Sequence, residues 1–133
     1  RLPGSGGAAD LGTNCWRIVV ITPHEKRRFV EKVDFITTPG YLTGGSAREE
    51  AGLPPGSGPY RIITSLAIMD FEERSRRMRV ISIHPGVTLE QVKENTGFEL
   101  LVKELLATTP EPDPKMLKIL REEVDPQRYI IGR

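Results

Sequence analysis

The chain has 133 residues, of which 19 are Lys or Arg and 18 are Asp or Glu, and its formal net charge is +1. A chain of this length forms one ordinary domain, or half of a larger one, and can bury a core without disulfides or metals. The balanced, scattered charges exclude a basic face strong enough to neutralise a run of phosphates, so we expect no nucleic-acid partner.

Cysteine content and hydropathy indicate the cellular compartment in which the protein is expected. Cys15 is the only cysteine, so no disulfide can form within the chain, and no Cys/His cluster has the spacing of zinc ligands. We therefore expect no metal site and a reducing, cytoplasmic location. The apolar runs, such as residues 18–21, are too short to cross a bilayer, and no signal segment opens the chain, so we expect no membrane partner.

The first residues predict a loop and then a strand. Residues 3–11, PGSGGAADL, predict a glycine loop, because glycines do not start a stable helix, with a short helical turn over 8–11. Residues 17–22, RIVVIT, predict a strand covered on both faces, as in the centre of an α/β sheet. The chain begins at Arg1 without a methionine, which we interpret as a fragment, a processed chain or an artificial boundary.

The following segments contain no clean helical periodicity. Residues 29–36 mix apolar and charged side chains, which favours extended structure. Residues 37–59 carry repeated Pro and Gly and predict a long loop with at most one helical turn, over 47–51. Loops of this length in compact domains are usually functional or mobile.

A hairpin and a capped helix are predicted next. Residues 60–71 and 78–83 are strand-like runs joined by the charged stretch 72–77. Thr88-Leu89-Glu90-Gln91 has the form of a capping box, which predicts a helix that begins there and ends at Gly97 in a left-handed C-cap.

The C-terminal part predicts a helix over residues 114–124. It starts with a cap followed by proline, Asp113-Pro114, and ends before the Asp-Pro pair at 125–126. Its apolar positions share one face: Met116, Leu117, Leu120 and Val124. The last apolar residues, 129–131, are suited to docking on a neighbour.

The run Gly4-Ser5-Gly6-Gly7 is the most informative local feature. Glycines let backbone amides approach an anion or an oxyanion. The run lacks the Lys-Ser/Thr of a Walker loop and the G-x-G-x-x-G spacing of a dinucleotide site. Composition alone therefore leaves a plain structural turn as an equal alternative.

Few other side chains are arranged for chemistry. His24, beside Glu25, is a candidate proton shuttle, but for it and for His84 a solvated or backbone-bonded histidine at a strand end is favoured. Cys15 is a candidate nucleophile if a helix terminus lowers the pKa of its thiol, although a small buried filler is favoured.

The charged residues likewise have both a functional and a structural interpretation. Residues 25–28 and 74–79 are candidate clamps for the phosphates of a nucleotide-like cofactor, with solvated turns as the favoured alternative. Four acids are candidate acid-base groups that spacing does not pair: Asp34, Glu49, Glu50 and Asp70. These patterns alone indicate an α/β domain with a glycine loop.

Taken together, the motifs resemble family I CoA-transferases. Residues 3–11 are similar to the GGAMDL loop of their B subunits and of 3-oxoacid CoA-transferases, where an apolar strand and a histidine, here His24, follow. Other segments resemble the glutaconate CoA-transferase B branch in the same order along residues 3–100: 27–42, 58–60 with 67–71, and 84–88 with 95–98.

The resemblance implies an α/β fold with an open, mostly parallel sheet and flanking helices, as in sugar-phosphate isomerases. Residues 1–133 are then the C-terminal portion of a B-subunit domain. The implied partners are the A subunit and the N-terminal half of the B subunit, in an A2B2-type assembly with the active site between subunits. The implied substrate is a coenzyme A thioester, with no tightly bound cofactor.

The resemblance also implies the chemistry. In these transferases a glutamate attacks the acyl-CoA and becomes a glutamyl-CoA thioester. Its segment lies upstream of the glycine loop and nothing in this chain matches it, so the catalytic nucleophile is not assigned. Five residues match positions that line the acyl-CoA site and offer backbone amides to the thioester oxygen: Gly4, Ser5, Gly6, Gly7 and Ala8. Ser5 replaces an apolar residue of the oxoacid enzymes, which leaves the acid substrate open.

Three functions remain in competition. The first is a CoA-transferase subunit acting on a dicarboxylate or enoyl acid. The second is an acyl-CoA decarboxylase or C–C hydrolase built on the same fold without the glutamate. The third is a non-catalytic half that completes a sheet and an interface. In each case we expect the isolated chain to expose apolar surface and to be poorly soluble.

Overall fold

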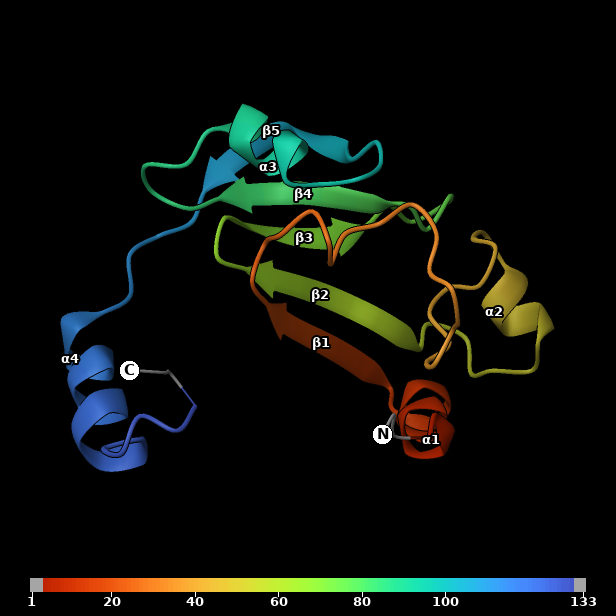
Figure 1. Cartoon of the computed structure of the whole chain (residues 1–133), viewed down its shortest axis with the longest axis horizontal. Coiled ribbons are helices and arrows are strands. Elements are labelled where there is room, and N and C mark those ends of the chain that lie inside the picture. Colours follow the sequence, from red (N-terminus) through yellow and green to blue (C-terminus); the bar gives the residue numbers. More distant parts are fainter. Residues whose placement is uncertain (1–3, 131–133) are drawn as a thin grey trace.

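The computed structural model describes residues 4–130, which form one five-stranded sheet with short helices around it (Figure 1). The strands lie in chain order across the sheet: β1 (Arg17–Thr22), β2 (Gly58–Thr64), β3 (Ala67–Phe71), β4 (Met78–Ile83) and β5 (Leu101–Thr108). The helices are α1 (Gly6–Asn14), α2 (Ala47–Glu50), α3 (Leu89–Glu94) and α4 (Pro114–Ile119), which continues as a π-helical turn, η1 (Leu120–Val124). No helix in this part of the chain is long and apolar enough to cross a membrane.

The open α/β sheet confirms the expected fold class, and its strand pairing is mixed. The expected parallel pairing holds at the two sides of the sheet, where β1 pairs with β2 and β4 with β5. The middle pairs, β2–β3 and β3–β4, are antiparallel. Their connections, 65–66 and 72–77, are too short for the crossover that parallel pairing needs. The predicted hairpin across 72–77 is thereby confirmed.

The apolar run 60–71 is two strands rather than one. The turn between them is built by Thr64, whose hydroxyl oxygen accepts hydrogen bonds from the backbone N–H of Leu66 (3.2 Å) and Ala67 (3.0 Å). A threonine that satisfies two turn amides lets the chain reverse without glycine or proline. This is why hydrophobicity alone did not reveal the break.

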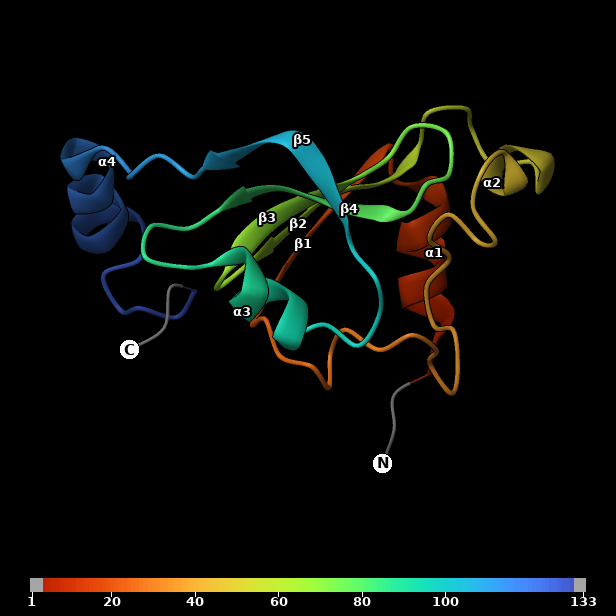
Figure 2. The ribbon, with the colours of Figure 1, turned by 90° about the horizontal axis from the view of Figure 1, so that it is seen from above.

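The core lies on one face of the sheet. The two views place α3 and the segment that follows β1 over this face (Figures 1 and 2). The buried apolar side chains come from the strands, from α3 and from these connecting segments: Phe29, Ile62, Ala67, Met69, Val80, Val92 and Leu100.

Strand β1 forms as predicted, but it lies at the edge of the sheet. Val19 is 50% exposed and Ile21 is 79% exposed, and β2 is its partner strand within residues 4–130. The expectation of a central strand covered on both faces is therefore wrong for this chain. β-Branched residues favour an extended backbone, whereas neighbouring elements decide whether it is covered.

Two predicted local structures differ from the observed ones. Residues 29–36 form bends and irregular structure instead of a strand, because this segment crosses over the sheet and has no strand beside it. Helix α3 ends at Glu94, before Gly97. Gly97 is needed for close approach, since its N–H donates to the Phe29 carbonyl at 2.7 Å, and a Cβ would lie 2.7 Å from that oxygen.

Other local predictions are confirmed. The Thr88 hydroxyl accepts from the Gln91 N–H, and the Gln91 side chain accepts from the Thr88 N–H, which completes the capping box. Helix α2 lies within the predicted turn at 47–51. Strand β5 was not anticipated, because residues 101–108 contain mostly residues without strand preference, and pairing with β4 decides their conformation.

The C-terminal helix lies beside the sheet instead of on it (Figure 1). Asp113 caps α4 by accepting from the Lys115 N–H at 2.7 Å, as predicted. The predicted apolar face is not buried, and Met116 and Val124 are both exposed. Tyr129 and Ile130 are exposed as well, whereas residue 131 of the predicted docking segment lies outside the described residues.

Candidate functional site

The glycine run forms the start of helix α1, so the predicted glycine loop gives way to helix two residues before Ala8. Ser5 occupies the N-cap position without a side-chain capping bond, and Gly6 begins the helix. Two glycines are tolerated here because each costs only about 1 kcal/mol relative to alanine and the residues from Ala8 onward continue the helix. Residue 3 of the predicted loop lies outside the described residues.

The first turn of α1 carries free amides. In an α-helix the first N–H groups have no acceptor within the helix. Ala9 is the first residue that donates back, to the Ser5 carbonyl at 2.9 Å. Within residues 4–130 no acceptor occupies the N–H groups of Gly6, Gly7 and Ala8. Free N–H groups at the positive end of a nine-residue helix are suited to hold negative charge.

These amides face open space. A Cβ placed on Gly4, Gly6 or Gly7 would meet no atom within 4 Å, and all three glycines are exposed. Packing within the described residues therefore does not require glycine at these positions. The missing side chains instead leave the amides accessible to a ligand or to another part of an enzyme.

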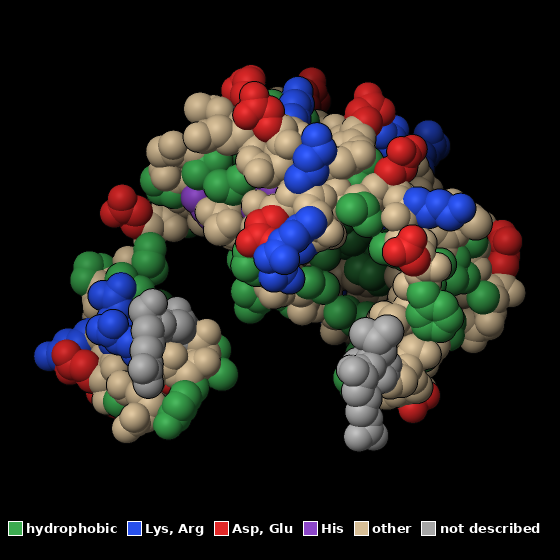
Figure 3. All heavy atoms as spheres, in the orientation of Figure 1, with side chains coloured by type: hydrophobic (Ala, Val, Ile, Leu, Met, Phe, Trp, Pro, Cys, Tyr) green, Lys and Arg blue, Asp and Glu red, His purple; other side chains and the backbone are tan. Residues whose placement is uncertain are grey.

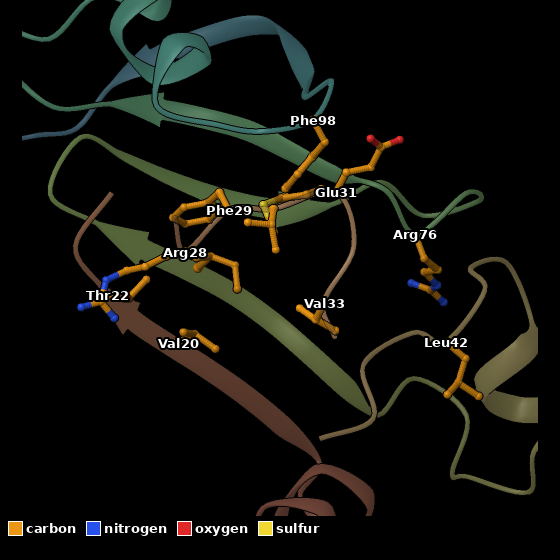
Figure 4. Close-up of a pocket in the computed structure, with 12 residues that line it drawn as sticks. Val20, Thr22, Arg28, Phe29, Glu31, Val33, Leu42, Arg76 and Phe98 are labelled. Atoms are coloured by element: carbon orange, nitrogen blue, oxygen red, sulfur yellow. The ribbon is translucent and has the colours of Figure 1, made fainter. Parts of the chain in front are cut away.

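An apolar pocket of about 820 Å³ lies on the covered face of the sheet (Figure 4). Its apolar walls come from the strands and from the segments above them, and include Val20, Phe29, Ile62, Met78 and Phe98. Arg28, Glu31 and Arg76 supply charge. Figure 3 shows hydrophobic side chains inside a hollow with charged ones around it. None of the five glycine-run residues lines this pocket.

A smaller, charged cleft of about 290 Å³ includes Tyr60 and two arginines that contact its ring. The guanidinium carbons of Arg17 and Arg61 lie 4.4 and 4.1 Å from the centre of the Tyr60 ring, within the range of cation–π attraction. In the same cleft Arg79 makes a two-pronged ion pair with Asp70, at 2.9 and 2.8 Å. Asp70 is thus an ion-pair partner and not a free base.

The charged stretch 72–77 forms a turn held by its own hydrogen bonds. Glu72 accepts hydrogen bonds from the N–H groups of Arg74 (3.0 Å) and Ser75 (2.7 Å), and from the Ser75 hydroxyl. These bonds lower the pKa of Glu72 to about 2. Arg77 pairs with Glu99 at 2.8 Å. The structure therefore supports a solvated turn for this stretch.

The other charged segment is also held locally. Arg27 and Arg28 both bind the Glu25 carboxylate, at 2.6 and 3.2 Å. The hydrogen bond from Arg27 is the main reason that the pKa of Glu25 is lowered. Residues 25–28 thus form a solvated turn like the first.

Both histidines are structural. His24 is 5% exposed, and its two ring nitrogens lie 3.0 Å from the hydroxyls of Thr64 and Thr96. Burial lowers the pKa of His24. His84 contacts the Thr109 hydroxyl at 3.0 Å and the Thr64 carbonyl at 2.8 Å. The favoured interpretation of a backbone-bonded histidine at a strand end is confirmed for His84. It is wrong for His24, which is buried and bonded to side-chain hydroxyls, and the proton shuttle is not supported.

The fold does not bring the remaining candidate catalytic residues into contact with one another. Cys15 is half-buried at the end of α1, and its N–H donates to the Leu11 carbonyl. Asp34, Glu49 and Glu50 are exposed, and none is hydrogen-bonded to a histidine. In the described part of the chain, no three His, Cys, Asp or Glu side chains are grouped as metal ligands. The glycine run is therefore the main candidate site that this chain carries.

Comparison with known proteins identifies relatives of the whole chain. A family model described as coenzyme A transferase matches residues 1–95. The B subunit of glutaconate CoA-transferase from Acidaminococcus fermentans is 40% identical over 131 residues, 98% of this chain and 48% of the relative. The B subunit of 3-oxoadipate CoA-transferase from Pseudomonas knackmussii is 44% identical over 121 residues, 91% of this chain and 46% of the relative.

A more distant relative has another activity. The cholesterol ring-cleaving hydrolase IpdB subunit of Rhodococcus jostii is 29% identical over 128 residues, 92% of this chain and 46% of the relative. This chain spans about half the length of the curated relatives it matches.

The fold agrees with these matches. The crystal structure of glutaconate CoA-transferase from Acidaminococcus fermentans superposes with a TM-score of 0.88 at 39% identity, over 100% of this chain and 50% of that chain. The family model covers 95 of 133 residues, and the identity to one member extends over nearly the whole chain. The resemblance is confirmed: the chain belongs to the coenzyme A transferase family.

Proposed function

We propose that this chain is the C-terminal half of the B subunit of a CoA-transferase, which moves coenzyme A from an acyl-CoA to a carboxylic acid. The observation that carries the proposal is the 40% identity to a glutaconate CoA-transferase B subunit across 98% of the chain. The same relative supports a dicarboxylate or an enoyl acid as the acid substrate.

The glycine run is the proposed acyl-CoA-binding element. Gly4, Ser5, Gly6, Gly7 and Ala8 line the site, and the free first-turn amides of α1 donate hydrogen bonds to the thioester oxygen. That oxygen gains negative charge when a nucleophile attacks the carbonyl carbon. Donors already oriented toward it stabilise the transition state more than the ground state.

The nucleophile is proposed to be a glutamate outside this chain. Its carboxylate attacks the acyl-CoA carbonyl and expels the CoA thiolate, which leaves an acyl-glutamyl anhydride. The thiolate then attacks the glutamyl carbonyl, forms glutamyl-CoA and releases the first acid as a carboxylate. The second acid runs the same steps in reverse. The proposal requires the thioester as substrate and no tightly bound cofactor or metal.

The partners are proposed to be the A subunit and the N-terminal half of the B subunit, in an A2B2-type assembly in the cytoplasm. The exposed apolar side chains along β1 support a partner, because an edge strand with Val19 and Ile21 in water invites pairing. Native mass spectrometry of the co-expressed subunits would test the stoichiometry.

The test of the reaction is intact mass spectrometry of the purified assembly with and without an acyl-CoA, followed by borohydride or hydroxylamine trapping. A glutamyl-CoA adduct on a co-purifying chain would support the transferase. Bound acyl-CoA without an adduct, in an assembly that turns over, would instead favour a decarboxylase or C–C hydrolase. The 29% identity to a ring-cleaving hydrolase subunit is the observation that favours the hydrolase alternative.

A further inference from the structure

Arg48, from helix α2, is buried inside the long loop and binds three separate segments. Its side chain donates from Nη2 to the Gly12 carbonyl of α1 at 2.8 Å and from Nη1 to the Gly40 carbonyl at 3.0 Å. Its Nε donates to the Ser57 hydroxyl at 3.3 Å. The residue is only 2% exposed. One planar guanidinium therefore ties α1 to the middle and to the last residue of the loop that connects β1 with β2.

The burial of this charge is not explained by ion pairing. No ion pair among residues 4–130 involves Arg48, whose observed acceptors are two carbonyls and a hydroxyl. A cation removed from water without a counter-ion opposes folding. An apolar residue would fill the space without that penalty, so the geometry of the three donated bonds is the property that distinguishes arginine here.

Helix α1 depends on this contact for its position. Gly12 is the buried residue of α1, and a Cβ on it would lie 2.5 Å from Thr38 Cγ2 and 3.0 Å from Pro39 Cδ. The helix therefore packs closely on the loop at Gly12, where Arg48 also binds. The free amides of Gly6 to Ala8 begin about 9 Å along the same helix, at 1.5 Å per residue. A shift or tilt at Gly12 moves those amides.

We propose that Arg48 is a positioning residue for the glycine run, which fixes α1 so that its first-turn amides meet the thioester oxygen. This inference rests on the proposed function for its catalytic consequence. The anchoring of α1 by Arg48 does not depend on the reaction, so the two can be tested separately.

The kinetic test compares Arg48→Lys and Arg48→Met in the complete assembled enzyme with Arg121→Met, an exposed arginine on η1. We expect kcat to fall about 10- to 100-fold in Arg48→Met, with KM for the acyl-CoA within about threefold, because misplaced oxyanion donors weaken transition-state binding. Arg48→Lys keeps the charge but not the three-way geometry, so it should recover kcat only in part. The control should match wild type.

A second variant disturbs α1 without changing Arg48. Gly12→Ala places a methyl group against Thr38, and the added change Thr38→Ser removes the carbon that it meets most closely. We expect Gly12→Ala to lower kcat with KM retained, and the double variant to regain part of the loss. This pair keeps the proposal testable if Arg48→Met does not fold.

Hydrogen exchange separates anchoring from catalysis. In Arg48→Lys the amides of α1 should exchange about tenfold faster, whereas those of β3 and β4 should not change. A lowered melting temperature with unchanged kcat in the folded enzyme, or unchanged α1 exchange, would overturn the proposal. Faster α1 exchange in an assembly that has no transferase activity even as wild type would refute the proposed function and leave the anchoring role standing.

Discussion

At the scale of single residues, backbone groups rather than side chains carry the candidate site. The histidines, Cys15 and the acids are hydrogen-bonded, paired or exposed, and none forms a nucleophile with its base in the described residues. The first-turn amides of α1 have no acceptor within residues 4–130. Side-chain motifs alone could therefore not have located the site.

The amide of Gly6 can be removed by substitution. Proline is accepted at the first helical position, where it lacks an N–H that the helix does not use, and it requires Ser5 to leave its α conformation (φ −91°, ψ −6°) for an extended one. In the assembled enzyme we expect Gly6→Pro to lower kcat about 10²- to 10³-fold, the usual effect of losing one oxyanion donor. Gly6→Ala keeps the N–H, and its methyl group meets no atom of the described chain, so kcat should fall less than in Gly6→Pro. Equal losses in both variants would contradict a role for the amide.

His24 makes stability depend on pH. Burial lowers its pKa in the folded chain below 6.5, so the unfolded chain binds the proton more readily. Its contribution to stability is therefore complete above pH 6.5 and is lost as pH falls from 6.5 through the lowered pKa. We expect the unfolding free energy of His24→Gln, from urea titrations between pH 7.5 and 5, to fall less steeply than that of wild type. Parallel curves would show that His24 does not titrate as its environment requires.

At the scale of elements, the helix caps could be predicted from neighbouring residues, whereas the position of a strand within the sheet could not. The capping box at Thr88 and the cap at Asp113 form as predicted, because each consists of bonds between residues close in sequence. Helix α1 begins two residues earlier than its glycines suggest, since the first turn requires no bonds from them. The central position predicted for β1 failed because strand neighbours come from elsewhere in the chain.

The capping box at α3 should be worth about 1 kcal/mol. We expect Thr88→Ala to lower the free energy of unfolding by about this amount, because the N–H of Gln91 loses its acceptor and the reciprocal bond weakens. Thr88→Ser keeps a hydroxyl at the cap and serves as the control. Chemical denaturation of both proteins gives the comparison, and a loss of equal size in Thr88→Ser would assign the effect to the methyl group instead.

At the scale of the whole molecule, the most notable surface of the described chain is the edge strand β1, whose apolar side chains are exposed. Ile21 and Val19 lie in water along this edge, although such residues are usually buried. The chain spans about half the length of the relatives that it matches.

Residues 1–133 alone should therefore self-associate through the β1 edge. Size-exclusion chromatography with light scattering should find oligomers or aggregates, and Ile21→Lys should shift the population toward monomer, because a charge on an edge strand opposes further pairing. Ile130→Lys, an exposed position away from the sheet, should have no such effect. A sharp thermal transition of a monomeric wild-type chain would contradict this expectation.

The amino-acid sequence by itself determined the family, the α/β class, the hairpin, the helix caps and the glycine run, because these depend on short motifs and on their order along the chain. Only the tertiary structure decided that α1 begins within the glycines, that β1 is an edge strand and that Arg48 is buried against Gly12. Burial and hydrogen bonding of that kind depend on contacts between segments that are distant in sequence, and a local sequence pattern does not specify those contacts.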